Sequence, residues 1–479
     1  ILHIFKVNAM KKFLRRAAVA VSAAVVSAAC IFSAGCIQLV PGPAGPKGDD
    51  LDFYDLFDAL NAEREANGEE PLTVSQFVEM YMDYISPDVE QTLSRQAAIN
   101  RSLLSSVAIL SQYSSGSKYN VYAGSGVIVD IDREAGDAYI VTNAHVAYDT
   151  EVTMSYCNRF YIYFYGADTA GVDYAATTSG EVINYTGVEA EDIQLIGISL
   201  AYDLAVLRVD DSDAIKNSRA VAAQFVQEDV YNVGEEVYAI GNPDGAGLSA
   251  TTGIISRDSE YISVMVDDIR EYRVMRTDTA INGGNSGGGL FNYDGQIVGI
   301  VNSKDEEKGT DNIGFALPSS YARRVVQSII DNYETSGASR RVFRYQIGID
   351  AVVSGSYAYT DDRTGLTEIT EVVTVGKVSG AANGIIQTGD IIKSFAVGTS
   401  DLGRSVLSSQ AESSFTVPVQ SYTVAQHYFE FDVTREYMIR DAMFSVRSGD
   451  TVCVEIERDG ATYYAYFVFS GNSNRISIE

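Results

Sequence analysis

The chain has 479 residues, which is too many for a single hydrophobic core, so two or three domains are expected. Hydrophobic residues make up 46% of the sequence and charged residues 21%, as in ordinary globular proteins. Acidic residues outnumber basic ones 64 to 35, and the net charge of −29 argues against nucleic-acid binding, which requires cations that neutralise phosphates. The acidic balance suits an exposed extracytoplasmic protein, although solubility alone explains it.

Residues 1–36 have the pattern of a bacterial lipoprotein signal. Translation is expected to start at Met10, where a basic segment is followed by an apolar one that ends at Phe32. Ser33 to Cys36 resembles a lipobox, which predicts lipidation of Cys36 and a protein anchored to the outer side of the bacterial cell membrane. Two alternatives stay open: Cys30 as the lipidated residue, and an uncleaved anchor formed by the same apolar stretch.

The next two segments predict a stalk and a helical region. Residues 37–50 are rich in Gly and Pro, and their collagen-like period of about three triplets is too short for a triple helix. Residues 51–104 carry apolar side chains at helical spacing, which predicts a helical hairpin with a break at Asn67-Gly68. A further helix is expected from about Pro87 to Leu104. The region serves as a spacer or as an oligomerisation element, and both interpretations stay open.

Three short segments supply the groups of a nucleophilic serine. TNAHV contains His145, YDLAVL contains Asp203 and GGNSGGGL contains Ser286. A hydroxyl is a poor nucleophile at neutral pH, so Ser286 needs a base, and the base needs a buried carboxylate that fixes its tautomer and stabilises the imidazolium. The order His, Asp, Ser is that of the chymotrypsin-like double barrel.

Taken singly, each of these segments has an ordinary structural interpretation. NSGG alone is typical of a glycine turn, and an aspartate among apolar residues is often a hydrogen-bonded structural acid. The chain has only three histidines, however, and His3 and His427 lie far from any catalytic pattern. The combination therefore predicts a triad of Ser286, His145 and Asp203.

The glycines before Ser286 predict an oxyanion hole. Attack on an amide carbonyl places negative charge on its oxygen, and donors must already point at that position. A glycine two residues before the serine lets two N–H groups converge there. We expect the amides of Gly284 and Ser286 to be the donors, with Asn285 holding the turn between them.

From residue 105 onward, short strand patterns replace helical ones. Ser125 to Asp130 and Ala138 to Thr142 are examples, and their spacing suits two packed antiparallel barrels. Residues 165–191 predict an inserted surface hairpin. Ser319 to Thr335 predicts a closing helix. Its apolar face is expected to consist of Ala322, Val325, Val326, Ile329 and Ile330.

These stretches resemble the HtrA/Deg family of serine proteases, in which a protease domain precedes a PDZ domain. The matching segments are collinear: GSGVIVD (Gly124 to Asp130), YIVTNAHV, YDLAVLRV, VYAIGNPDG (Val237 to Gly245), TTGIISR (Thr251 to Arg257), DTAINGGNSGGGLFN (Asp278 to Asn292), GQIVGIVN (Gly295 to Asn302) and NIGFALPSS (Asn312 to Ser320). The resemblance implies a mainly β chymotrypsin-like protease domain at 105–338 that hydrolyses misfolded or exposed polypeptides without metal or cofactor. It also suggests a homotrimer.

Two further expectations rest on this resemblance. The family usually has proline where Gly289 stands, and the glycine is expected to loosen the following strand. The segments Thr279 to Asn282 and Ile300 to Ser303 are expected to line the specificity pocket, with Ala280, Ile281, Ile300 and Val301 as its apolar residues. A pocket without an acid favours cleavage after small or medium aliphatic residues. Asp278 is the nearest acid.

Residues 339–479 resemble a PDZ-like α+β domain. Gly376 to Phe395 follows the pattern of a helical turn, GDII and a strand, and 436–444 and 451–458 are expected to form a helix and a strand. The loop Ile347, Gly348 and Ile349 stands at the place of the family's carboxylate-binding loop, where backbone amides hold a C-terminal peptide that adds as a strand. An insertion at about 400–430 is atypical, and an inert appended β domain is the alternative.

Cysteine usage is sparse, and no cluster of metal-ligand type occurs in the sequence. Besides Cys30 and Cys36, the chain has only Cys157 and Cys453, one in each predicted domain. Two ordinary buried thiols are favoured over a disulfide between them.

The sequence thus predicts a serine-type endopeptidase that acts through an acyl-enzyme in extracytoplasmic protein quality control. A catalytically silent chaperone or scaffold that binds unfolded chains or C-termini is the main alternative. A structural surface lipoprotein is the third. Polypeptides are the expected substrates, and the membrane is reached through the lipid anchor.

Overall fold

The computed structural model describes residues 87–115, 118–149, 154–166, 187–227, 231–266, 268–304, 313–336, 343–360, 365–399, 407–409, 429–469 and 475–477, with five residues between 61 and 72. The chain forms two compact units, Ile1–Gln96 and Ala97–Glu479. The predicted signal with Cys30 and Cys36, the stalk and the inserted hairpin lie outside the described residues, apart from the ends of the hairpin. In the first unit, the backbone N–H and C=O of Leu72 both bond to the side chain of Asn61.

The predicted helix before the protease region is α5, Pro87–Leu103. Its last residues belong to the second unit, where Leu103 is buried and Ala98 and Ile99 pack against the main apolar core. The hydroxyl of Ser102 bonds to that of Tyr238 at 2.9 Å, which ties the end of the helix to the barrel described below. The helix therefore anchors the start of the protease region.

Six strands form the first antiparallel sheet, in the order β6-β1-β2-β3-β8-β7. An isolated bridge between Ile162 and Val188 links the edge strand β6 to the segment that leads into β7, so the two edges of the sheet approach each other. The predicted strands at 125–130 and 138–142 are contained in β2 and β3. The bounds are β1 Ser106–Ser115, β2 Lys118–Asp132, β3 Asp137–Thr142, β6 Arg159–Phe164, β7 Ile193–Ser199 and β8 Leu204–Val209.

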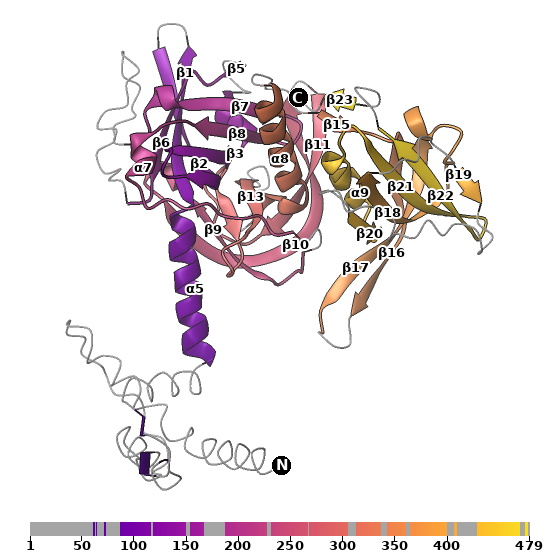
Figure 1. The fold of residues 1–479 in the computed structure, drawn as a ribbon, viewed down its shortest axis with the longest axis horizontal. Helices are drawn as coiled ribbons and strands as arrows, with labels where there is room; N and C mark the ends of the chain where they lie inside the picture. The colour runs from indigo at the N-terminus through magenta and orange to yellow at the C-terminus, as the bar shows by residue number, and fades with distance from the viewer. Residues whose placement is uncertain are drawn as a thin grey trace. The chain divides into compact units, whose positions relative to one another are not determined.

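Six further strands close into a second barrel in the order β10-β11-β14-β13-β12-β9 (Figure 1). Short elements between β3 and β6 and after β8 complete the protease region: α6 Ala144–Ala147, β4 Tyr148–Asp149, β5 Ser155–Tyr156 and α7 Asp213–Lys216. The predicted chymotrypsin-like double antiparallel barrel is confirmed. The strands of the second barrel are β9 Glu236–Gly241, β10 Ser249–Val266, β11 Asp268–Thr277, β12 Gly289–Phe291, β13 Ile297–Lys304 and β14 Gly314–Pro318.

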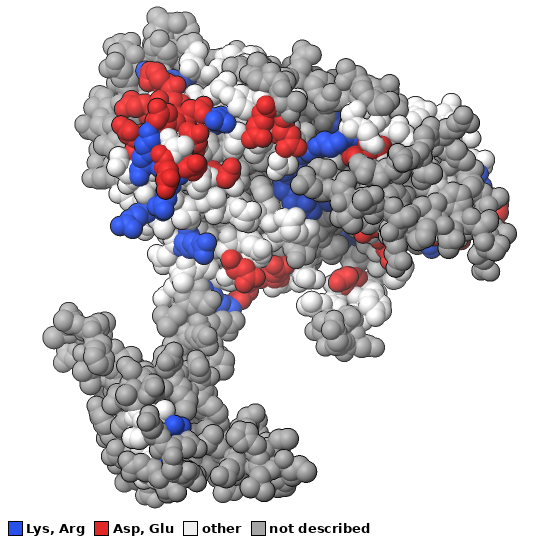
Figure 2. Space-filling view, in the orientation of Figure 1, with Lys and Arg blue, Asp and Glu red and all other residues white. Residues whose placement is uncertain are grey.

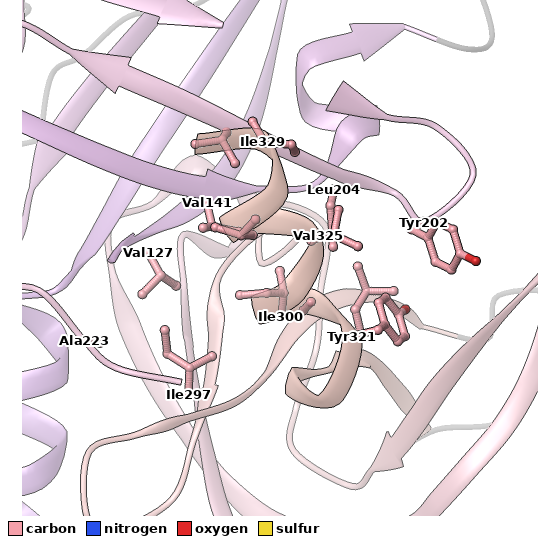
Figure 3. Close-up of a cluster of buried hydrophobic side chains, with 14 of the residues drawn as sticks. Val127, Val141, Tyr202, Leu204, Ala223, Ile297, Ile300, Tyr321, Val325 and Ile329 are labelled. Atoms are coloured by element: carbon pink, nitrogen blue, oxygen red, sulfur yellow. The ribbon is translucent and has the colours of Figure 1, made fainter. Parts of the chain in front are cut away.

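The main apolar core lies between the two barrels and beneath the closing helix α8, Ser319–Ser336 (Figure 3). Val325 and Ile329 of α8 point toward Val141 and Leu204 of the first sheet and Ile300 of the second. Burial of such aliphatic side chains stabilises the fold by roughly 1.5–3 kcal/mol each. The predicted helix is confirmed, and Ile330 is the one residue of its predicted apolar face that stays partly exposed.

The C-terminal region forms its own seven-stranded sheet, with β16-β17-β18-β21-β22-β19 in order and β20 added to β18. The expected helix at 436–444 is the short α9, Tyr437–Ala442, followed by a 3₁₀ turn at Met443–Ser445. The remaining bounds are β15 Phe343–Tyr345, β16 Ile349–Thr360, β17 Thr367–Val378, β18 Ile391–Thr399, β19 Leu407–Ser409, β20 Phe429–Asp432, β21 Asp450–Arg458, β22 Ala461–Val468 and β23 Arg475–Ser477. Most of the predicted insertion lies outside the described residues.

Buried ion pairs join the C-terminal region to the protease barrels within the second unit. Arg273 of β11 donates to Asp441 of α9, and both side chains are 3–4% exposed. Arg435 pairs with Asp258 of β10 in the same way. Breaking such a pair leaves a buried charge uncompensated, at a cost of about 3–5 kcal/mol. The two regions are thus fixed to each other by specific contacts.

Cys157 and Cys453 are free thiols, as the sequence favoured. Burial raises the pKa of Cys157 to about 12, and burial raises that of Cys453 to about 12 as well. Both groups therefore stay neutral at physiological pH, which excludes either thiolate as a nucleophile there.

Acidic side chains gather on the face over α7 and the neighbouring strands (Figure 2). Glu189, Asp192, Asp211 and Asp213 lie around a cavity of about 800 Å³, and Lys216 pairs with Asp211. Burial raises the pKa of Asp192, and its acidic neighbours raise it further. Of the helices in the described part of the chain, none is long and apolar enough to span a membrane.

Candidate active site

The three predicted catalytic residues come from three different connections at the junction of the barrels. His145 lies on α6, directly after β3, and Asp203 lies in the tight turn between β7 and β8. Ser286 lies in the loop that leads from β11 to β12. His145 and Ser286 line one pocket of about 230 Å³. His3 and His427 lie outside the described residues.

Asp203 binds His145 through both of its carboxylate oxygens. Nδ1 of His145 lies 2.7 Å from Oδ2, and the His145 backbone N–H donates to Oδ1 at 2.9 Å. The carboxylate is 11% exposed and the imidazole 40% exposed. This arrangement places the proton on Nδ1 and leaves Nε2 as the acceptor for the serine proton. Asp203 has φ +49, a left-handed conformation that aspartate tolerates better than most residues.

Asn302 contacts both the acid and the nucleophile, although its role was not predicted. Its side-chain N–H donates to Asp203 Oδ2, and its Oδ1 accepts a hydrogen bond from Tyr272 Oη at 3.0 Å. Its backbone carbonyl accepts a hydrogen bond from Ser286 Oγ at 2.8 Å. Asn302 is 2% exposed, so these bonds are shielded from water. Asn302 thus helps to orient the carboxylate and also holds the hydroxyl of the nucleophile.

The loop before Ser286 leaves two backbone amides without a backbone acceptor. The amides of Asn285, Gly287 and Gly288 donate to carbonyl groups at 2.9–3.1 Å. Among the backbone bonds of the described residues, none comes from the amide of Gly284 or of Ser286. Gly284 has φ +95, and a Cβ there would lie 2.2 Å from a backbone oxygen. Both amides are thus available as the predicted oxyanion donors, and Asn285 uses its own amide to hold the turn.

Ser125 fixes this loop from the other barrel. Its hydroxyl donates to the carbonyl of Gly284 at 2.7 Å and accepts the amide of Asn242 at 2.8 Å. Its own amide donates to the carbonyl of Ser286 at 2.8 Å, and its carbonyl accepts the hydroxyl of Thr142. Ser125 is fully buried, and its position inside GSGVIVD gave no sign of this role.

We expect Ser125→Ala to lower kcat by about 10- to 100-fold, less than the loss of an oxyanion donor itself, because the carbonyl of Gly284 loses the bond that orients it. KM for a small ester substrate should change much less. Steady-state kinetics with the ester measure both constants, and Ser256→Ala, at an exposed position on β10, is the control. An unchanged kcat in Ser125→Ala would show that the loop is held without this hydroxyl.

The expectation that Gly289 loosens the following strand is wrong. Gly289 starts β12 and pairs with Ile300 on one side and Ile240 on the other. A Cβ at this position would lie 2.3 Å from the ring of Phe291. The aromatic ring thus fills the space that a side chain would need, and pairing on both edges holds the strand.

The predicted pocket residues occupy different environments. Ile300 belongs to the core between the barrels, whereas Ile281 and Val301 belong to the interior of the second barrel. Ala280 is exposed. Of the four, only Ala280 is exposed, and the other three are buried in these cores.

The predicted peptide loop lies at the edge of the C-terminal sheet. Ile347 is buried in the core of that region, and Gly348 has φ +87. The carbonyl of Gly348 accepts the amide of Ser379 at 2.6 Å, and a Cβ at Gly348 would lie 2.1 Å from the Ser379 oxygen. Ile349 starts β16, which pairs with β17 and with no other strand in the described part of the chain. The other edge of β16 is therefore the side at which a strand can add.

No group of three His, Cys, Asp or Glu side chains suited to a metal ion occurs in the described part of the chain.

Comparison with known proteins agrees with this geometry. Residues 124–300 match the family described as trypsin-like peptidase domain. Serine protease Do-like HtrA of Bacillus subtilis is 33% identical over 249 residues, which is 51% of this chain and 47% of the relative. A probable periplasmic serine endoprotease DegP-like of Rhizobium meliloti is 34% identical over 196 residues, 40% of this chain and 31% of the relative. The solved structure of HtrA-type protease AlgW with tripeptide is 23% identical, with 78% of this chain and 96% of that chain covered and a TM-score of 0.44.

The fold and the matched family thus define residues 124–300 as a trypsin-like peptidase domain, and this range contains His145, Asp203 and Ser286. Within that class, the relatives that the chain resembles are named HtrA-type and DegP-like serine proteases. The chain spans less than half the length of the two curated relatives named above.

Proposed function

We propose that this protein is a serine endopeptidase that cleaves exposed or misfolded polypeptides through an acyl-enzyme. The observation that carries the proposal is the pairing of His145 with Asp203 at 2.7 Å in a site where Ser286 lines the same pocket. The backbone amides of Gly284 and of Ser286 itself have no backbone acceptor among the described residues. Nucleophile, base, orienting acid and oxyanion donors are then all available.

In the proposed reaction, Ser286 attacks the scissile carbonyl and His145 takes its proton at Nε2. The amides of Gly284 and Ser286 stabilise the oxyanion. Asp203 stabilises the imidazolium, which then protonates the leaving amine. Water then attacks the acyl-enzyme in the same way, with His145 as the base. This step releases the acyl half of the substrate and restores the hydroxyl of Ser286. Asn302 keeps the carboxylate of Asp203 in place throughout these steps.

Unfolded casein provides the direct test of this function. The proposal predicts degradation to peptides, followed by mass spectrometry, and no requirement for added metal. The alternative function is that of a catalytically silent chaperone. The hydroxyl of Ser286 favours this alternative, because it donates to the carbonyl of Asn302 in place of the base His145, as a resting state would. Suppressed aggregation of a second unfolded protein without any cleavage of casein would support that alternative.

The segments that flank Ser286 predict cleavage after small or medium aliphatic residues. Ala280 is exposed, and Ile281, Ile300 and Val301 supply apolar support. A buried cation would lack a partner in such surroundings, at a cost of several kcal/mol. A peptide library read out by mass spectrometry should show valine, alanine or similar residues before the cleaved bond. A dominant preference for lysine or arginine at that position would refute the assignment and point to Asp278.

We also propose where the protein is located and how it assembles. A relative named a periplasmic endoprotease and the lipobox-like Cys36 support an extracytoplasmic protein on the bacterial cell membrane, held by a lipid anchor. The family resemblance supports a homotrimer. Quality control of misfolded proteins is the role that fits this location.

The C-terminal region is proposed to bind the free carboxylate end of a peptide at Ile347 to Ile349 and to raise activity. The C-terminal region contacts the residue next to the catalytic acid. Tyr202 directly precedes Asp203, and its ring packs on that of Phe444 with centroids 4.9 Å apart. Arg344 also donates to Tyr202 Oη at 3.1 Å. A ligand acts only through its different affinity for the active and silent forms.

Peptides with a free C-terminal carboxylate are expected to raise reporter turnover by roughly 5- to 150-fold, the usual range of coupling between sites. The same peptides with a C-terminal amide are the control. Gly348→Ala should abolish the activation, because its Cβ would collide with Ser379. Equal rates with carboxylate, amide and no peptide would leave the region as a tether.

A further inference from the structure

A second recognition site lies on the histidine side of the nucleophile. The pocket of about 230 Å³ that contains His145 and Ser286 extends along β1 and β2 to Asp149. Apart from Ser286, all of its lining residues belong to the first barrel and its connections. The pocket is thus separate from the segments at 279–282 and 300–303, which belong to the second barrel.

The chemistry of acyl transfer decides which part of the substrate enters this pocket. The imidazolium of the base gives its proton to the leaving amine, so the leaving peptide must lie on the side of His145. The acyl half of the substrate lies at the oxyanion amides of Gly284 and Ser286, in the second barrel. The pocket beside His145 therefore receives the side chain that follows the scissile bond.

The lining of this pocket consists mainly of hydrogen-bond acceptors and aromatic rings. Asp149 is 9% exposed, and Ser111 is fully buried with its side chain beside Tyr113. Tyr113 donates its own proton to the carbonyl of Val146 at 2.8 Å, so its oxygen can act only as an acceptor toward other groups. Burial raises the pKa of Tyr113 above its usual value, and the neighbouring Cys157 and Asp149 raise it further, so the phenol stays neutral.

Tyr122 forms the outer wall and stays 47% exposed. Its ring meets that of Tyr113 edge to face, with centroids 5.7 Å apart. A cation that enters the pocket would thus pass an aromatic face before it reaches a carboxylate, and both interactions favour positive charge. An apolar side chain would gain neither of these interactions, and an acidic one would be repelled by Asp149.

The acid is fixed relative to the base by a short connection. Asp149 follows His145 by four residues and ends β4, where it pairs with Ser155 of β5. The rings of Tyr148 and Tyr156 pack edge to face on this two-stranded ladder, with centroids 5.1 Å apart. The backbone of Asp149 thus has a fixed place beside the leaving-group pocket.

We propose that Asp149, together with Ser111, Tyr113 and Tyr122, selects a lysine or arginine side chain as the first residue after the scissile bond. The inference rests on the proposed protease function and specifies its substrate. Aliphatic residues before the bond and a cationic residue after it would then define the preferred cleavage sequence.

Internally quenched peptides test this inference. They share valine before the scissile bond and differ only in the next residue, which is lysine, norleucine or glutamate. The full-length protein should show a kcat/KM for the lysine peptide at least about tenfold above that for the norleucine peptide, with the glutamate peptide lowest. Asp149→Asn should bring the ratio of lysine to norleucine close to one.

Two further variants make the result decisive. Asp213→Asn changes a side chain that is 93% exposed on α7 and should keep the ratio and the basal activity. Tyr122→Leu, at a half-exposed position that tolerates substitution, should lower the ratio in part and serves if Asp149→Asn does not fold. A ratio near one in the unaltered protein, or one unchanged in both pocket variants, overturns the inference while Ser286-dependent cleavage still supports the protease. Absence of cleavage of every peptide contradicts the protease function itself, and the inference falls with it.

Discussion

Replacement of Ser286 by alanine is expected to lower kcat for peptide hydrolysis by on the order of a millionfold, the usual effect of removing the nucleophile from such a unit. The substitution removes one hydroxyl from a partly exposed loop and one hydrogen bond, to the carbonyl of Asn302. The free energy of unfolding should therefore change by no more than about 1 kcal/mol. Casein hydrolysis measures the first effect and urea denaturation the second.

Ser256→Ala is the matched control for this prediction. Ser256 is an exposed serine on β10, so its loss should alter neither activity nor stability. Residual hydrolysis by Ser286→Ala above a small fraction of the original rate would remove Ser286 from the role of nucleophile. If activity and stability were both largely lost, the loss of activity would not identify Ser286 as the nucleophile.

The substitution Asp203→Asn is expected to have the second-largest effect, a fall in kcat of about 10⁴-fold. The carboxylate accepts hydrogen bonds from the backbone of His145, from His145 Nδ1 and from the side chain of Asn302. An asparagine offers one acceptor oxygen and an NH₂ group, so at least one of these donors would face another donor. The imidazole then shifts to the tautomer that cannot accept the serine proton.

Hydrolysis of a small ester across pH 6 to 9 measures this loss. Asp213→Asn, on the exposed surface of α7, is the control for the change of charge. NMR of the imidazole nitrogens distinguishes the expected change of tautomer from a simple loss of structure. Ester hydrolysis by Asp203→Asn within about tenfold of the original rate would contradict the role of Asp203 as the orienting acid.

The triad could be predicted from the sequence because each of its members lies in a local segment that carries its own information. His145, Asp203 and Ser286 each lie in a short motif, the three motifs follow the chymotrypsin-like order, and the glycines of the loop allow the bend before Ser286. The closing helix α8 could be predicted equally well, because its apolar residues recur with the period of an α-helix and face the core.

The residues that support the site could not be predicted in the same way. Ser125 acts on Gly284, 159 positions away in the chain, and Asn302 acts on Asp203, 99 positions away. Neither role follows from local pattern, since each depends on how the two barrels are brought together. Gly289 was misinterpreted for the same reason, because the ring of Phe291 and the pairing with β9 and β13 become visible only in the fold.

The environment of the predicted specificity-pocket residues could not be derived from the sequence either. Ile281, Ile300 and Val301 are apolar and close to the nucleophile in the sequence, but they belong to two separate cores. Asp149 was not predicted as a recognition residue at all. The order of residues places it near His145, yet only the packing of β1, β2 and β4 shows that it lines the same pocket.

Mass-spectrometric labelling with an organophosphonate tests the central claim most directly. Such a reagent forms a stable adduct only with a serine whose base and oxyanion donors are in working positions. We predict a single adduct on Ser286, absent after Ser286→Ala and strongly slowed by Asp203→Asn. Absence of an adduct on Ser286 under every activating condition, including saturating carboxylate peptide, would contradict the claim and favour a silent scaffold.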